Sequence, residues 1–176
     1  MSSRGFSLIE VLIALVLLCV AVLGVLQLVA IAVSATNAAR VQSLTVALAS
    51  ARLEQLRALT FDFDELGSPA TDMTTDLSTA TPGPTGNGLA SGGSIETSVG
   101  GYVDHLDRLG SWIGNSTAPP PDAAYTRRWA VTSSPLAANV LVLDVAVFPV
   151  AGPAGGAAGG APGSTRFTTL VARRQR

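Results

Sequence analysis

Residues 6–35 read FSLIEVLIALVLLCVAVLGVLQLVAIAVSA, and Glu10 is the only charged side chain among them. No proline interrupts the run, so it predicts one continuous helix. At about 1.5 Å per residue that helix extends roughly 45 Å, whereas the hydrocarbon core of a bilayer is about 30 Å thick. The run therefore predicts a membrane-spanning helix that continues beyond the bilayer.

The sequence after this run stays weakly polar, and the first proline comes after Leu59. We therefore expect one helix over residues 6–59, with residues 6 to about 30 in lipid. A helix that meets water should show a clear polar face. This one carries two apolar stripes instead, so its distal half should be covered by its own globular domain and by neighbouring copies. The stripes are formed by Val41, Leu44, Leu48 and Ala51 and by Leu53, Leu56 and Leu59.

The composition limits the other classes of protein. The 176 residues suffice for one domain and an appendage, and only 13% are charged, against about 25% in typical soluble proteins. A net charge of -1 gives no electrostatic attraction for nucleic acid. The single cysteine, Cys19, excludes a disulfide framework and a cysteine metal site. A secretory signal fits poorly, because its apolar region is about 7–15 residues long. A plain single-pass anchor, with Arg4 keeping the N-terminus in the cytoplasm, remains open.

The presence of Glu10 in the apolar run requires an explanation, since a carboxylate within a membrane helix costs a few kcal/mol unless it is paired. One interpretation places it near enough to the membrane surface to be hydrated. The other pairs it with a cation that appears only if the chain is cut after Gly5, namely the new α-amino group of Phe6. Between packed helices, the amine of one chain and the carboxylate of its neighbour can meet and fix the register of the helices.

The stretch GFSLIEVLIAL (residues 5–15) resembles the prepilin signature of type IV pilins and type II secretion pseudopilins. The resemblance implies that residues 1–5 are the leader and that prepilin peptidase cleaves between Gly5 and Phe6. It also implies that Phe6 is N-methylated, that Arg4 supplies the leader charge and that Glu10 directs assembly. The expected partners are other pilin or pseudopilin subunits, the peptidase and inner-membrane lipid.

Major subunits of this family usually carry a proline at the place that Gln27 occupies here, so a minor subunit is favoured. The run EVLIALVLLCVAVLGVLQL is similar to minor subunits of the PilV or GspI type, and a pilus and a secretion pseudopilus both stay open. The resemblance implies an inner-membrane protein with a cytoplasmic N-terminus that enters a periplasmic or extracellular filament, in its initiation or tip complex. The alternative is a single-pass, membrane-anchored extracytoplasmic binding domain that does not polymerise.

Residues 60–176 are expected to form the extracytoplasmic domain. Residues 60–94 are rich in Gly, Pro, Ser, Thr and Asp and predict a loop, as does the Gly-rich segment 151–163. Strands are predicted over 125–133, 139–150 and 165–174, and one face of the second is almost wholly apolar. That face should cover the helix. The predicted fold is α+β, a long N-terminal transmembrane helix packed by its distal half against a small antiparallel sheet, as in the pilin family.

No constellation for an enzyme is present: His105 is the only histidine, and no nucleophile elbow or phosphate loop follows a strand. No cofactor and no metal is expected. Two acidic groups are interpreted as solvated loop residues rather than Ca²⁺ ligands. Two arginine groups are interpreted as solvated strand ends rather than a DNA-binding patch, because few aromatic residues can stack on bases. Trp112 and Trp129 should pack on the sheet. The acidic groups are Asp62, Asp64 and Glu65, and Asp104, His105 and Asp107; the arginine groups are Arg127 and Arg128, and Arg173, Arg174 and Arg176.

Overall fold

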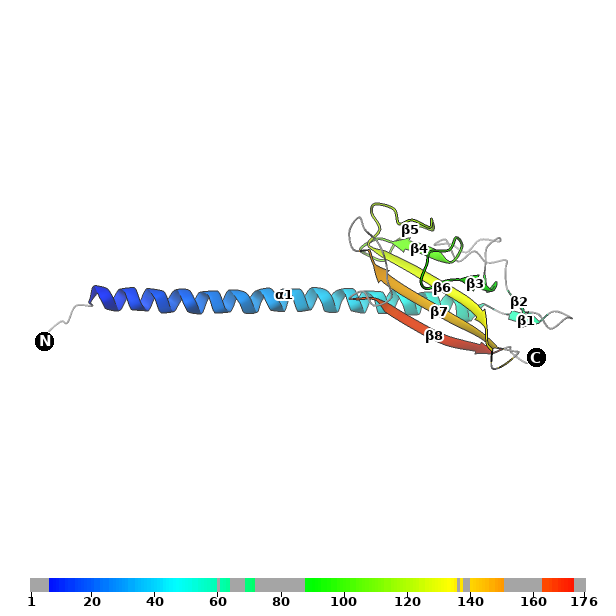
Figure 1. Cartoon of the computed structure of the whole chain (residues 1–176), viewed down its shortest axis with the longest axis horizontal. Coiled ribbons are helices and arrows are strands. Elements are labelled where there is room, and N and C mark those ends of the chain that lie inside the picture. Colours follow the sequence, from blue (N-terminus) through cyan, green and yellow to red (C-terminus); the bar gives the residue numbers. More distant parts are fainter. Residues whose placement is uncertain are drawn as a thin grey trace. The chain divides into compact units, whose positions relative to one another are not determined.

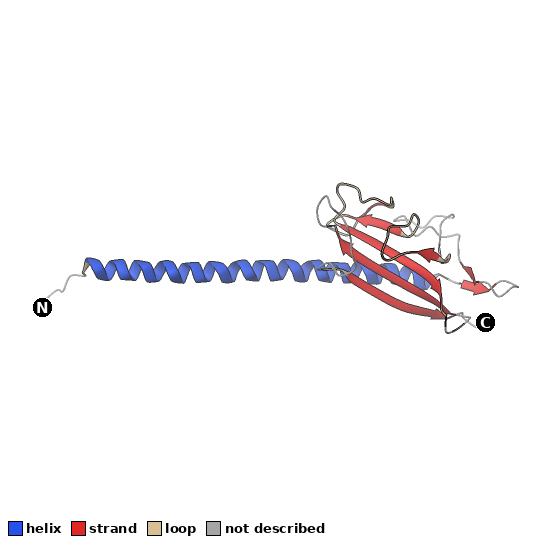
Figure 2. Ribbon diagram, in the orientation of Figure 1, coloured by secondary structure: helices blue, strands red, loops and turns tan. Residues whose placement is uncertain are grey.

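The computed structural model describes residues 7–59, 61–63, 69–71, 88–135, 137, 140–150 and 163–172. The helix α1 runs from Leu8 to Ala58 without a break. The strands are β1 (Phe61–Phe63), β2 (Pro69–Thr71), β3 (Gly92–Gly93), β4 (Val103–Leu106), β5 (Trp112–Gly114), β6 (Tyr125–Ser133), β7 (Val140–Pro149) and β8 (Thr165–Ala172). Figures 1 and 2 show the order of these elements along the chain.

The chain divides into two compact units, residues 1–40 and 41–176, and α1 contributes to both. In the first unit every large hydrophobic side chain from Leu8 to Val33 is at least 48% exposed. In the second unit the distal part of α1 packs against an antiparallel sheet, which confirms the predicted α+β class (Figure 2). The helix therefore has one covered half and one half whose apolar side chains lack cover from the described residues.

The main sheet has the strand order β5-β4-β6-β7-β8, and β3 also pairs with β6. All of its pairings are antiparallel, and the β6–β7 ladder runs from the Tyr125–Pro149 pair to the Ser133–Leu141 pair. The three predicted strands are present with small differences at their ends. Strands β4 and β5 were not among the strands predicted from the sequence.

One face of the sheet covers the helix, as predicted from the apolar alternation of β7. Leu141, Leu143, Val145 and Val147 are fully buried and form one cluster with Ala49 and Leu56 of α1. Trp129 of β6 lies in this cluster, and Trp112 packs against it, so both tryptophans have the predicted packing role. Removing this apolar surface from water, at about 25 cal/mol per Å², drives the docking of helix and sheet.

The segment 60–94, which the composition predicts as a loop, contains strands where it is described. Strands β1 and β2 pair antiparallel with each other, and β3 pairs with β6. Short strands of this kind carry no period-2 pattern, because two or three residues are too few to show one. Most of the predicted Gly-rich loop 151–163 lies outside the described residues, as do the tail arginines Arg173, Arg174 and Arg176.

Candidate functional site

The first candidate site is the beginning of α1. Glu10 lies in the first turn of the helix and is exposed. The backbone N–H groups of Glu10 and Val11 donate to the carbonyl oxygen of Ser7, at 3.0 and 3.3 Å. A carboxylate in the first turn is stabilised by the positive end of the helix dipole. Arg4, Gly5 and Phe6 lie outside the described residues, so the pairing of Glu10 with the amino group of Phe6 stays a prediction.

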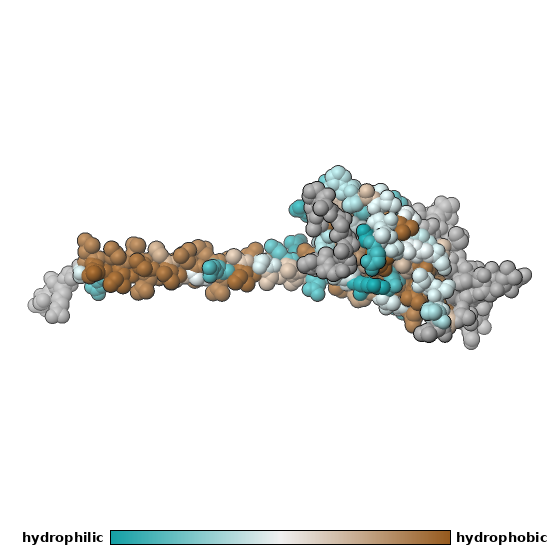
Figure 3. All heavy atoms as spheres, viewed as in Figure 1, coloured by the Kyte–Doolittle hydropathy of each residue, from teal (hydrophilic) through white to brown (hydrophobic). Residues whose placement is uncertain are grey.

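The helix that follows Glu10 is hydrophobic all round. Figure 3 shows hydrophobic side chains on the visible face along the N-terminal half of α1. By length and composition this is a helix that can cross a membrane. A helix with no polar face needs lipid or other protein around it, since exposed apolar surface of this extent is unstable in water. The covering material must therefore come from outside this chain's described residues.

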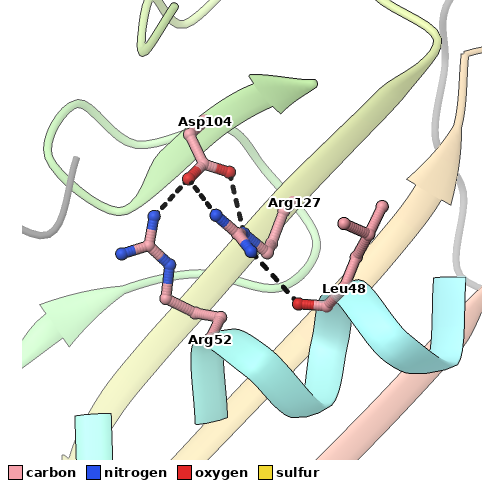
Figure 4. Close-up of polar contacts among 4 residues, drawn as sticks. All are labelled: Leu48, Arg52, Asp104 and Arg127. Carbon is pink, nitrogen blue, oxygen red and sulfur yellow. Dashed lines mark hydrogen bonds and ion pairs between the residues drawn. The ribbon is translucent and has the colours of Figure 1, made fainter. Parts of the chain in front are cut away.

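The second candidate site is a buried ion cluster that joins α1 to the sheet (Figure 4). Arg127 of β6 donates to both carboxylate oxygens of Asp104 on β4, from Nε at 3.0 Å and from Nη2 at 2.7 Å. Arg52 of α1 donates from Nη2 to Oδ2 of the same carboxylate. Arg127 also donates from Nη1 to the carbonyl oxygen of Leu48, at 3.1 Å. One carboxylate thus connects a helix and two strands.

All three members of the ion cluster are buried: Asp104 is 0%, Arg52 2% and Arg127 7% exposed. The guanidinium of Arg52 also lies 4.4 Å from the centroid of the Trp129 ring, a cation–π contact. Buried charges are tolerated only when they are paired and hydrogen-bonded. Sliding the helix by one turn would separate Arg52 from Asp104 and would also move the carbonyl oxygen of Leu48 away from Arg127. The cluster therefore specifies where the sheet sits along α1.

The arginines of β6 correct two sequence interpretations. Arg127 and Arg128 are each 7% exposed, so they are neither solvated strand ends nor a DNA-binding patch. They occupy opposite faces of β6, because successive side chains of a strand alternate. Strand β7 separates β6 from β8, so these two strands are not neighbours, and the tail arginines lie outside the described residues. The sequence contains one signal for the buried role of Arg127: it lies two residues from Tyr125 and two from Trp129, so all three share one face of the strand.

Arg128 holds a loop on the outer face of the sheet, the face away from α1. Its Nη1 donates to the carbonyl oxygens of Ile95 and Glu96, at 3.3 and 2.9 Å, and its Nε donates to Oγ of Ser98 at 3.2 Å. The guanidinium also lies 5.2 Å from the centroid of the Phe148 ring. Burial lowers the pKa of Arg128, and the nearby carboxylate of Glu96 opposes that shift. Arg128 is thus a structural clamp for residues 95–98.

The acidic group around His105 also differs from its interpretation as solvated loop residues. Asp104 and His105 are fully buried in β4. Nε2 of His105 donates to the carbonyl oxygen of Ser116 at 2.8 Å, and Nδ1 lies 3.1 Å from Oγ1 of Thr126. Asp107 accepts from the backbone N–H groups of Leu109 and Ser111, both at 2.8 Å, and so shapes the turn before β5. Each group has a structural partner.

No metal centre is formed by the part of the chain that the structure describes, since no three His, Cys, Asp or Glu side chains gather there. Asp64 and Glu65 lie outside the described residues, and the side chain of Asp62 is not described. Arg52 was not among the site residues predicted from the sequence. Its signal was a single charge between Leu48 and Leu56, which lie one helical turn away on either side and face the sheet.

Residues 1–26 match a family model described as the prokaryotic N-terminal methylation motif. The match spans the predicted leader, residues 1–5, and the first part of the apolar helix, and it agrees with the prepilin-type signal that the sequence resembles. No curated protein and no solved structure matches the chain. A pilin-like prepilin signal joined to an α+β domain indicates a structural subunit that assembles with other pilin-like subunits.

Proposed function

We propose that this chain is a minor pilin or pseudopilin, which enters the initiation or tip complex of a type IV pilus or a type II secretion pseudopilus. The observation that carries the proposal is the methylation motif at residues 1–26, which includes the beginning of an exposed helix that is apolar apart from Glu10 as far as Leu26. Such a helix is stored in lipid before assembly and covered by neighbouring helices afterwards. Cleavage between Gly5 and Phe6 supplies the amino group that Glu10 pairs with.

The minor role, of the PilV or GspI type, is supported by the unbroken helix. α1 continues through Gln27 with no kink-forming proline between Leu8 and Ala58. A proline there would remove a backbone hydrogen bond and loosen the helix. A subunit that keeps this helix rigid suits a fixed position in a small complex better than a filament whose subunits are repeatedly drawn from the membrane.

The test is intact mass spectrometry and N-terminal sequencing of the full chain, isolated from membranes of cells with an active prepilin peptidase. A chain that begins at Phe6 and is one methyl group heavier than its sequence supports processing. The matched control is the same measurement on a Gly5→Trp variant, which should stay uncut. A wild-type chain that still carries Met1 or Ser2 refutes the proposal and leaves the non-polymerising membrane-anchored domain.

A further inference from the structure

The side-chain amide of Gln27 lies within the apolar half of α1. Residues 11–26 before it and 28–33 after it contain no charged or amide side chain. Gln27 follows Glu10 by 17 residues, about 26 Å along a helix, which is less than the hydrocarbon thickness of about 30 Å. If Glu10 lies at one membrane surface, Gln27 is therefore still within lipid.

The amide of Gln27 is exposed and has no hydrogen-bond partner among the described residues. Two hydroxyl groups farther along α1 are satisfied within the helix itself. Ser34 donates to the carbonyl oxygen of Ile31, and Thr36 donates to that of Ala32, both at 2.8 Å. An amide that is left unpaired in hydrocarbon is strongly disfavoured. The hydrogen bonds of Gln27 must therefore come from outside its own helix.

Gln27 lies on a face of α1 that repeats every seven residues, here called the Gln27 seam. Residues spaced alternately three and four apart share one face of a helix. Ile13 and Val20 precede Gln27 at seven-residue steps, and β-branched residues in that row favour two parallel helices, while an amide in the row fixes their register. The seam consists of Ile13, Val16, Val20, Leu23, Gln27, Ala30, Ser34 and Asn37, all of them exposed.

The residues that follow Gln27 on the seam, Ala30 and Ser34, are small. Small residues let two membrane helices approach closely enough for side-chain hydrogen bonds. A glutamine amide has a carbonyl acceptor and N–H donors, so two Gln27 amides can bond to each other reciprocally. This pairing requires parallel helices in register. Two copies of one chain meet that condition, since they insert with the same topology and carry Gln27 at the same depth.

We propose that α1 self-associates in the membrane through the Gln27 seam, as a parallel pair held in register by hydrogen bonds between the Gln27 amides of two copies. A second copy is the occupant because its amide is complementary and lies at the same depth, which no other chain provides by necessity. Every residue of the seam belongs to the first compact unit, residues 1–40. The pairing goes beyond the proposed function, in which Glu10 and the cleaved N-terminus direct assembly.

The test measures self-association of the full chain in phospholipid vesicles, by energy transfer between donor-labelled and acceptor-labelled copies at increasing protein-to-lipid ratios. Gln27→Met keeps the length of the side chain but removes the amide, and should raise the dissociation constant about 3- to 30-fold. Thr36→Val is the matched control. Thr36 lies two and a half turns after Gln27, on the opposite face, and its hydroxyl bonds within the helix, so association should not change.

Cysteine cross-linking then locates the face that makes the contact, in a Cys19→Ser background. Ala30→Cys places a thiol on the seam, and Val29→Cys places one at nearly the same depth on the opposite face. A disulfide needs Cα atoms within about 7 Å of each other. Oxidation in vesicles should therefore join copies of the Ala30→Cys variant into dimers and leave the Val29→Cys variant monomeric.

Four results would overturn the proposal. A wild-type chain that stays monomeric at every ratio would mean that Gln27 is only hydrated near the membrane surface. Equal association of the wild type and Gln27→Met would mean that the amide does not hold the pair. Equal cross-linking of the two cysteine variants would place the contact elsewhere. Energy transfer that is lost when membranes with other pilin-like subunits are added would identify a different chain as the preferred occupant.

The vesicles contain no prepilin peptidase, so self-association is measured on the uncut chain. N-terminal processing is measured separately, in cells that contain the peptidase. Failure of the Gln27 seam and failure of the proposed function are therefore distinguishable.

Discussion

Asp104 is a buried carboxylate that pairs with two buried guanidinium groups, those of Arg52 and Arg127. We predict that Asp104→Ala lowers the free energy of unfolding by about 3–5 kcal/mol, because both buried arginines lose the hydrogen bonds and the negative charge of this carboxylate. Urea unfolding of the full chain in detergent, followed by the fluorescence of the buried Trp129, measures this change.

The matched control for that variant is Asp144→Ala, which removes an ion pair whose arginine, Arg166, is 56% exposed. Solvent screens such pairs, so the expected loss is only about 0–1 kcal/mol. Arg52→Met should fall between the two, since the bidentate pair of Arg127 and Asp104 survives. Equal effects of Asp104→Ala and Asp144→Ala would contradict a central role for the ion cluster.

Tyr102 makes stability depend on pH at the alkaline end. Its hydroxyl donates to the carbonyl oxygen of Ala90 at 2.9 Å, and burial raises the pKa of Tyr102 above its ordinary value. The folded state thus favours the neutral phenol. Its contribution to stability is complete below the unfolded pKa of about 10, and is lost as the pH rises through the higher folded pKa.

The measurement is the free energy of unfolding of the full chain between pH 8 and the alkaline limit of folding. Tyr102→Phe should lower stability by about 0.5–1.5 kcal/mol at neutral pH, through the lost hydrogen bond, and should reduce the alkaline decline. An unchanged decline in the variant would assign it to other groups.

At the scale of the element, β3 depends on a glycine. Gly93 has a φ of 80°, and a Cβ there would lie 2.2 Å from the carbonyl oxygen of Trp129 and 2.8 Å from the Tyr102 ring. Gly93→Ala should therefore cost at least about 2 kcal/mol, since backbone strain and overpacking add. Gly100→Ala is the control, because nothing lies within 4 Å of its added Cβ. The measurement is the melting temperature of the two variants, determined in parallel. Similar melting temperatures would contradict the prediction and show that β3 shifts to accommodate the added methyl group.

At the scale of the whole molecule, Glu10 should separate membrane insertion from assembly. We predict that Glu10→Ala is inserted and cleaved like the wild type, since the apolar helix is intact, but that its incorporation into complexes falls at least about tenfold. Glu54→Ala is the matched control: Glu54 lies on the same helix with its side chain 69% exposed and pairs only with Arg57 among its described contacts. Co-isolation from cross-linked membranes measures incorporation. If Glu10→Ala is incorporated normally, the result would favour the alternative in which Glu10 is only hydrated at the membrane surface and has no role in assembly.

The sequence by itself determined the long helix, the α+β class and the three longest strands, because each depends on a local pattern that extends over many residues. The unbroken apolar run required a helix in lipid or between helices, and the alternation in β7 fixed which face covers it. The prepilin motif was readable for the same reason, since its residues lie next to one another in the chain.

Only the tertiary structure decided the roles of Arg52, Asp104 and Arg127. They are 23 to 75 residues apart, and the sequence pattern of each element is compatible with a solvated charge. Their burial follows from the register between α1, β4 and β6, which arises from packing rather than from any local propensity. The place of β8 at the end of the described strand order likewise depends on how the strands pair, and no single strand carries that information.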